Sequence, residues 1–178
     1  MNIKPTLDNL TNWNMKMFSD SDYAGDKDTR KSVTRYVLFL CGVPITWKSK
    51  AQRSVSLSSS EAEYIALSEA VKEIRFVYYL LTSLGIKVEV LITVQVDNVG
   101  AIFMSENVTT SNRTKHVDVQ YKYVKTFVDE EFVKIIFVKS EDNRADIFTK
   151  NVSKDILERH VVDMISMEDE LEKDKSET

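Results

Sequence analysis

The pattern of polar and apolar positions in the first fifty residues predicts three successive β-strands. Residues 15–20 mix polar and apolar side chains over the length of a strand, and residues 36–40 are a run of aromatic and aliphatic side chains. Residues 41–44 contain a glycine and a proline and supply a turn, after which residues 45–48 have the character of a returning strand. We therefore expect an antiparallel meander of three strands.

The segment that follows has the clearest helical periodicity in the chain. Its apolar residues recur on one helical face at Ile74, Val77, Leu81 and Leu84. Gly85 then provides a natural stop. Two capping boxes are available at the start of this helix, Ser58 with Glu61 and Ser60 with Glu63.

The second half of the chain alternates between strand and helix patterns. Residues 91–97 and 133–139 read as strands, whereas residues 98–105 and 117–128 have helical character. Helical character returns after residue 143 and includes a segment over 153–165. Because crossovers of this length pack over a sheet, the two later strands are expected to run parallel to the first. The prediction is a mixed five-stranded α/β sheet.

Composition and charge limit the remaining choices. The chain has 178 residues, of which 43% are hydrophobic and 29% charged, and this favours one globular domain over a disordered chain. The single cysteine excludes a disulfide framework and a multi-cysteine zinc site. No stretch of the sequence is long and apolar enough to cross a membrane. We therefore expect an intracellular protein. We expect a polar leader over residues 1–12, a domain over 13–166 and an acidic, disordered tail over 167–178.

Four carboxylates fall at positions that can converge. Asp20 and Asp97 each close a predicted strand, and sites in open α/β sheets form beyond the carboxyl ends of parallel strands. Glu63 lies near the start of the long helix, on the side that leads into its apolar face. Asp146 falls in the first turns of the last predicted helix, directly after the fifth strand.

Each of these acids also has a purely structural explanation. Asp146 can serve only as a favourable charge at a helix N-terminus, and an aspartate that ends a strand is often a turn former. Glu63 can complete a capping box with Ser60, although it is released from that role if Ser58 and Glu61 form the box. Taken together, however, four carboxylates without counter-charges repel one another, and such clusters ordinarily hold divalent cations.

The donor set selects the kind of cation. All-oxygen ligands suit Mg²⁺, with Mn²⁺ as a substitute, and the chain offers no cysteine and histidine set for zinc. Two such ions roughly 3.5–4 Å apart activate a water and stabilise the leaving oxygen in phosphodiester hydrolysis. The acids therefore predict a two-metal hydrolytic site.

These residues also belong to motifs that occur together in a known family. In chain order the motifs are Phe18-Ser-Asp-Ser-Asp-Tyr-Ala-Gly25, Asp28-Thr-Arg-Lys-Ser32, Ile45-Thr-Trp-Lys-Ser-Lys50, Leu57-Ser-Ser-Ser-Glu-Ala-Glu-Tyr64, Val96-Asp-Asn98, Arg113-Thr-Lys-His-Val-Asp118 and Ala145-Asp-Ile-Phe-Thr-Lys150. The chain resembles the ribonuclease H domain that ends the polyprotein of copia-type LTR retrotransposons. The resemblance covers roughly residues 15–165 and implies the ribonuclease H-like fold, with helices packed on both faces of the sheet.

The resemblance also implies an activity and its residues. The family's catalytic and metal-binding acids carry over onto Asp20, Glu63, Asp97 and Asp146, and Asp22 is a rival for the first position. The implied reaction is cleavage of the RNA strand of RNA–DNA hybrids with two Mg²⁺ or Mn²⁺ ions. The implied setting is a cytoplasmic virus-like particle, in which a reverse transcriptase domain precedes this one in the same polyprotein.

Two groups of residues are candidates for holding the nucleic acid. They are the basic cluster Lys48, Lys50 and Arg53, and the hydroxyls of Ser58, Ser59 and Ser60 at the predicted helix N-terminus. RNA–DNA hybrids are recognised through their backbone shape and 2′-hydroxyls, for which such groups are suited. A solvated hairpin edge and an ordinary helix cap explain the same residues equally well.

The chain departs from the family's pattern in ways that keep other functions open. Cellular ribonucleases H carry a histidine in a loop before the last aspartate, whereas residues 139–143 contain none, and His116 is a weak substitute. Arg35 stands where a small residue is usual. A catalytically silent spacer or hybrid-binding module is therefore the alternative. A DNA strand transferase of related fold is disfavoured, because its acids follow the order Asp, Asp, Glu.

Overall fold

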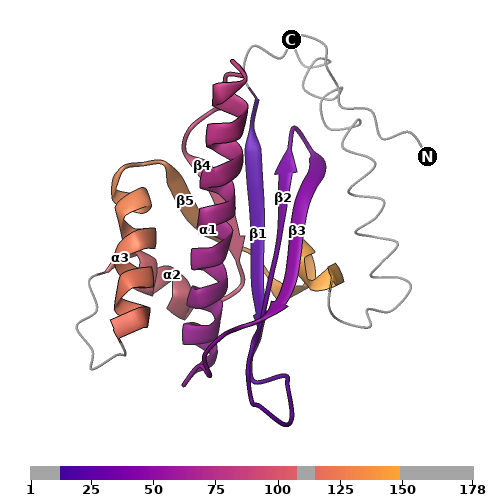
Figure 1. Ribbon diagram of the computed structural model, residues 1–178, viewed down its shortest axis with the longest axis vertical. Helices are drawn as coiled ribbons and strands as arrows, with labels where there is room; N and C mark the ends of the chain where they lie inside the picture. The colour runs from indigo at the N-terminus through magenta and orange to yellow at the C-terminus, as the bar shows by residue number, and fades with distance from the viewer. Residues whose placement is uncertain (1–12, 108–114, 149–178) are drawn as a thin grey trace.

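A five-stranded mixed sheet forms the centre of the computed structural model, which describes residues 13–107 and 115–148 (Figure 1). The strands are β1 (Met15–Asp22), β2 (Val33–Leu40), β3 (Val43–Ala51), β4 (Ile92–Val96) and β5 (Val133–Phe137). They lie in the order β3-β2-β1-β4-β5. β1, β2 and β3 pair antiparallel, β4 runs parallel to β1, and β5 runs parallel to β4. The meander with two added parallel strands is therefore confirmed.

In the part of the chain that the structure describes, three α-helices pack on one face of this sheet. They are α1 (Ser59–Ser83), α2 (Val99–Glu106) and α3 (Lys115–Asp129). Figure 1 shows α1 running along the sheet over β1, with α2 and α3 on the side of β4 and β5. The main core lies between these two layers, where the ring of Tyr64 on α1 stacks on Tyr121 of α3 with 4.1 Å between the ring centres. Burial of such aromatic pairs fixes how α3 sits against α1.

The opposite face of the sheet carries a smaller apolar cluster and two short 3-10 helices. These helices are η1 (Ser140–Asp142) and η2 (Arg144–Phe148). Ala145 of η2 packs with Phe18 and Phe39, and the Arg144 guanidinium lies about 5.5 Å from the centre of the Phe18 ring. The contact places η2 against β1 and β2.

Helix α1 begins and ends where its sequence predicts. The Ser58 hydroxyl accepts a hydrogen bond from the Glu61 amide at 3.1 Å, and the Glu61 carboxylate accepts one from the Leu57 amide at 2.7 Å. Gly85 has φ +80°, a left-handed conformation that glycine adopts without strain. Of the two capping arrangements open to the sequence, the structure forms the one with Ser58 and Glu61, and Glu63 is left for another role.

Some boundaries differ from the sequence-based expectation. β1 continues two residues past Asp20, so this aspartate lies within the strand rather than at its end. Asp146 lies in the 3-10 helix η2, not in an α-helical turn. The leader over residues 1–12, the helix over 153–165 and the acidic tail over 167–178 fall outside the described residues. Within the described part of the chain, no helix is long and apolar enough to span a membrane.

Candidate active site

The carboxylates meet at one edge of the sheet, beyond the point where the neighbouring parallel strands β1 and β4 end. Asp20 lies on β1, and Asp97 directly follows β4. Glu63 reaches this edge from α1 on one face of the sheet, and Asp146 reaches it from η2 on the other. One carboxylate oxygen from each of Asp20, Glu63 and Asp97 lies within 4.8 Å of the other two. Three acids from separate elements thus form one cluster.

Two hydrogen bonds from Ser21 on β1 hold Glu63 in this position. Its Oε1 accepts hydrogen bonds from the Ser21 amide at 3.0 Å and from the Ser21 hydroxyl at 2.9 Å. Its Oε2 is buried and has no hydrogen-bond partner among the described residues. A buried carboxylate oxygen left without a partner is costly, and a bound cation would satisfy it.

Asp97 is held by the first residue of η1, the short helix after β5. The Ser140 hydroxyl donates a hydrogen bond of 2.6 Å to Asp97 Oδ2. The next residue, Asn98, caps α2 by accepting from the Ala101 amide at 2.9 Å, and the Ser60 hydroxyl donates to the same oxygen at 3.2 Å. The starts of α1 and α2 are therefore tied together beside the acids.

A buried asparagine positions the fourth acid. Asn143 is fully buried, its side-chain amide donates to the Ser19 carbonyl at 2.9 Å, and its side-chain oxygen accepts from the Ala145 amide at 3.1 Å. These bonds fasten η2 to β1 and bring Asp146 to the side of Asp20. Asp22, the rival of Asp20, instead has a side chain that is 46% exposed, against 5% for Asp20. The structure places Asp20, not Asp22, in the cluster of acids.

Crowding perturbs the ionisation of these groups. Burial, followed by the Asp146 and Asp97 carboxylates, raises the pKa of Asp20 to about 7. Burial, followed by the Asp20 and Asp97 charges, raises the pKa of Glu63 to about 8. Both shifts have the sign expected of carboxylates held together in the absence of sufficient counter-charge. Perturbed acids of this kind concentrate at functional sites.

One cation, Arg35, enters the cluster from β2. Arg35 is the antiparallel partner of Asp20, and its guanidinium lies 3.0 Å from Asp20 Oδ2 and 3.0 Å from Asp22 Oδ2. It also lies 3.8 Å from Asp146 Oδ1. The sequence marks Arg35 only as a departure from the family's pattern. Its contact with Asp20 depends on strand register, for which the one available signal was the spacing of the two strands around their turn.

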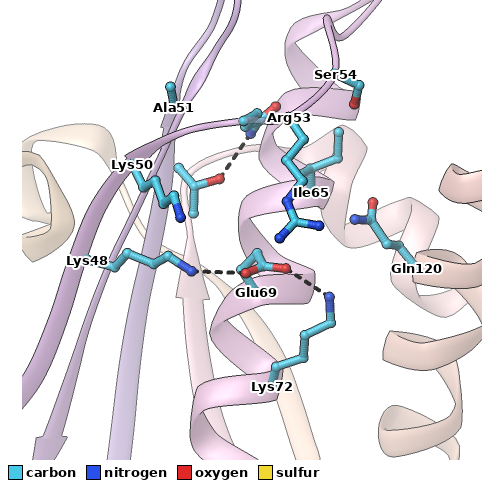
Figure 2. Close-up of a pocket in the computed structure, with 11 residues that line it drawn as sticks. Lys48, Lys50, Ala51, Arg53, Ser54, Ile65, Glu69, Lys72 and Gln120 are labelled. Atoms are coloured by element: carbon cyan, nitrogen blue, oxygen red, sulfur yellow. Dashed lines mark hydrogen bonds and ion pairs between the residues drawn. The ribbon is translucent and has the colours of Figure 1, made fainter.

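The predicted basic cluster lines a pocket beside α1. The pocket has a volume of about 370 Å³ and lies between β3 and the first half of α1. Figure 2 shows Lys48, Lys50 and Arg53 projecting toward α1, where Lys72 joins them. Glu69 lies among these cations and pairs with Lys48 at 3.0 Å and with Lys72 at 2.8 Å. Sequence reasoning missed Lys72, which enters the pocket because it lies one helical turn after Glu69.

Gln52 connects this pocket to the carboxylates. Gln52 lines the pocket and donates a hydrogen bond of 2.9 Å to the carbonyl of Ala62, the residue before Glu63. The predicted serines lie at the start of α1 and do not line the pocket: Ser58 caps α1, Ser60 contacts Asn98, and Ser59 is exposed. The side chain of His116 falls outside the described residues. The candidate nucleic-acid contacts therefore form two groups rather than a single patch.

The arrangement fits divalent cations. It combines a group of carboxylates from separate parts of the chain, a buried Glu63 oxygen with no hydrogen-bond partner among the described residues, and acids whose pKa values are raised by burial and by mutual repulsion. Mg²⁺ and Mn²⁺ prefer all-oxygen sites of this kind. Asp20, Glu63 and Asp97 can therefore hold a metal ion, with Asp146 beside Asp20 as a further ligand.

Comparison with known proteins finds relatives of the chain among transposon polyproteins. No protein-family model matches it. Over 144 residues it is 40% identical to the retrovirus-related Pol polyprotein from transposon TNT 1-94 of Nicotiana tabacum, which covers 81% of this chain and 11% of that polyprotein. Over 137 residues it is 36% identical to the corresponding polyprotein from transposon RE1 of Arabidopsis thaliana, covering 77% of this chain and 9% of that one. The chain is homologous to part of the retrovirus-related Pol polyproteins of plant transposons. It spans about a tenth of their length.

Solved structures identify the fold of the chain. LC11-RNase H1 in complex with an RNA/DNA hybrid superimposes with a TM-score of 0.55 at 14% identity, covering 75% of this chain and 91% of that one. The N-terminal RNase H domain of a Mycobacterium tuberculosis protein gives a TM-score of 0.53 at 12% identity, covering 83% of this chain and 96% of that one. At these identities the likeness shows the fold alone. The chain has the ribonuclease H fold, as the resemblance of its motifs implies.

Proposed function

We propose that this Pol segment is a metal-dependent endonuclease that hydrolyses the RNA strand of RNA–DNA hybrids during the reverse transcription of a copia-type retrotransposon. The single observation that carries the proposal is the cluster of Asp20, Glu63 and Asp97, whose carboxylate oxygens lie within 4.8 Å of one another on a ribonuclease H fold. Homology to Pol polyproteins and the hybrid bound by a structural neighbour support it.

The residues of the site have distinct roles in this proposal. Asp20, Glu63, Asp97 and Asp146 would hold two Mg²⁺ or Mn²⁺ ions. Bound there, the ions supply a water of lowered pKa and neutralise charge on the leaving oxygen. The chain's own contribution is to fix the ligands: Ser21 orients Glu63, Ser140 orients Asp97, and Asn143 holds the element that carries Asp146.

The flanking groups are suited to a nucleic-acid backbone. Four cations line the pocket beside α1, against one carboxylate, Glu69. A phosphate entering the pocket can replace Glu69 as the partner of Lys48 or Lys72, and it would release counterions from the hybrid. Ser59 and the N-terminus of α1 offer a hydroxyl and free amides outside this pocket. We infer that a hybrid lies across the edge of the sheet between these groups.

The homologous polyproteins suggest the setting. In that setting a reverse transcriptase domain precedes this segment in the same polyprotein and produces the hybrid that it cleaves, within a cytoplasmic virus-like particle. A hybrid-binding module with little turnover is the second candidate function. Arg35 favours it, because this buried cation already pairs with Asp20, which would be a metal ligand.

A panel of labelled substrates tests the proposed function. The full chain is incubated with Mn²⁺ and an RNA–DNA hybrid, duplex DNA, single-stranded RNA or duplex RNA of one sequence. We expect cleavage of the RNA strand of the hybrid alone, since the proposed substrate is an RNA strand paired with DNA. Equal cleavage of duplex RNA would refute this specificity, and hybrid binding without cleavage would favour the second candidate.

A further inference from the structure

Arg35 is the most deeply buried charged side chain in contact with the acids. Only 2% of its surface is exposed. One terminal nitrogen lies 3.0 Å from Asp20 Oδ2 and 3.8 Å from Asp146 Oδ1, and the other lies 3.0 Å from Asp22 Oδ2. Its Nε is buried with no hydrogen-bond partner among the described residues. Within residues 13–107 and 115–148, all the polar contacts of the guanidinium are thus with carboxylates.

Arg35 contacts only two of the four candidate metal ligands. Arg35 pairs with Asp20 and approaches Asp146, whereas no ion pair to Glu63 or Asp97 occurs among the described residues. A buried guanidinium is stable only while it keeps its carboxylates, because an unpaired buried charge is strongly unfavourable. A divalent cation that uses Asp20 and Asp146 must therefore displace Arg35 or bind beside its positive charge.

The register of β2 places Arg35 on the covered face of the sheet. It lies on the same side of the strand as Val37 and Phe39, which are buried with Ala145 of η2. Of the three carboxylates that Arg35 contacts, Asp22 alone has a largely exposed side chain. The guanidinium is therefore closest to solvent at Asp22.

We propose that Arg35 is a tethered cation that competes with divalent metal for Asp20 and Asp146 and thereby sets the metal concentration at which the site fills. The inference rests on the proposed function, since it assumes that these acids bind metal. It predicts a chain that folds without metal because Arg35 supplies part of the missing counter-charge. It also predicts weak metal binding, limited by one residue outside the ligand set.

Binding of Mn²⁺ to the full chain tests this proposal without any measurement of cleavage. Free Mn²⁺ is followed by its paramagnetic resonance signal as wild type, Arg35→Gln and Arg35→Met are titrated. A positive charge within about 4 Å of a cation opposes binding strongly even in a polar environment, and we expect both variants to bind Mn²⁺ at least about tenfold more tightly than wild type. Their melting temperatures should also rise more on adding Mn²⁺ than that of wild type.

Arg144→Gln is the matched control. Arg144 lies on the same face of the sheet and stacks on Phe18 and Phe39, so its loss removes a nearby positive charge from outside the acid cluster. We expect this variant to bind Mn²⁺ as wild type does. If a metal-free Arg35 variant is unfolded, Mn²⁺ should refold it, because metal then replaces the lost counter-charge.

The outcomes separate this proposal from the proposed function. If wild type and the Arg35 variants bind Mn²⁺ equally, or if Arg144→Gln gains as much as they do, competition by Arg35 is wrong while the metal site stands. If no variant binds or refolds with Mn²⁺, the acids are not a metal site and the proposed function fails as well. Tighter binding restricted to the two Arg35 variants supports the proposal.

Discussion

The substitution Glu63→Gln should change how the stability of the metal-free chain depends on pH. Burial and the charges of Asp20 and Asp97 raise the pKa of Glu63 from 4.5 to about 8. A carboxyl group with a raised folded pKa holds more protons in the native state than in the unfolded state over this interval. The free energy of unfolding therefore falls as the pH rises from about 4.5 towards about 8.

The size of the effect follows from the shift. At about 1.36 kcal/mol per pKa unit, the shift changes the free energy of unfolding by at most about 5 kcal/mol. By pH 8, about 4 kcal/mol of this stability is lost. In Glu63→Gln the amide oxygen can still accept the two hydrogen bonds from Ser21. The new amino group has no described partner and costs about 1–3 kcal/mol, but this cost does not vary with pH. Between pH 5 and 8 the variant should thus lose several kcal/mol less than wild type.

Urea unfolding in the presence of chelator, repeated at steps from pH 5 to 8, measures this difference. Glu69→Gln is the control on the same helix. Burial alone would raise the pKa of Glu69, but Lys72 and Lys48 outweigh burial and lower it. Its charge therefore adds stability at neutral pH that is lost on acidification, the opposite sign to Glu63. Identical pH dependence of wild type and Glu63→Gln would show that Glu63 does not ionise against its neighbours.

Three further predictions concern the ligands, the anchoring of η2 and the basic pocket. Asp97→Asn should lower the rate of hybrid cleavage in single-turnover assays by at least about a thousandfold, or roughly 4 kcal/mol. Asp22→Asn should lower this rate less. A larger loss in Asp22→Asn would indicate that Asp22, not Asp20, is the first metal ligand. Asn143→Ala should lower the free energy of unfolding by about 2 kcal/mol in urea, because two buried hydrogen bonds to β1 and η2 are lost; an unchanged midpoint would contradict this anchoring. Lys50→Gln should lower the slope of the hybrid-binding constant against salt concentration, on logarithmic scales, by about one phosphate contact, whereas Lys87→Gln, at an exposed position, should not. Equal slopes for the two variants would show that the hybrid does not contact the pocket.

Elements whose pattern is local were predictable from the sequence. The heptad-like recurrence of apolar residues and Gly85 located α1, and alternation located β4, because each signal lies within one element. The choice between two caps could not be made from spacing alone. It depends on whether Ser21, a residue about forty positions earlier, offers Glu63 a better set of donors than Ser60 does.

The parts of the site that depend on pairing between distant segments were not predictable. Asp20 and Arg35 meet because β1 and β2 pair in one register, and a shift of one residue would turn Arg35 to the other face. Lys72 joins the pocket only because α1 crosses over the meander, beside Lys48 on β3. The acids could be found by position along the chain, whereas the cations that surround them required the fold.

The four acids are proposed to form a metal site that cleaves RNA paired with DNA. Cleavage of the end-labelled RNA strand of a hybrid, by wild type, Arg35→Gln and Asp97→Asn with millimolar Mn²⁺ or with excess chelator, tests this proposal most directly. With metal, we expect fragments from wild type, more fragments from Arg35→Gln and none from Asp97→Asn, and we expect no fragments from any of the three in chelator. Cleavage that persists in chelator or in Asp97→Asn, or none from either wild type or Arg35→Gln with metal, would contradict the claim.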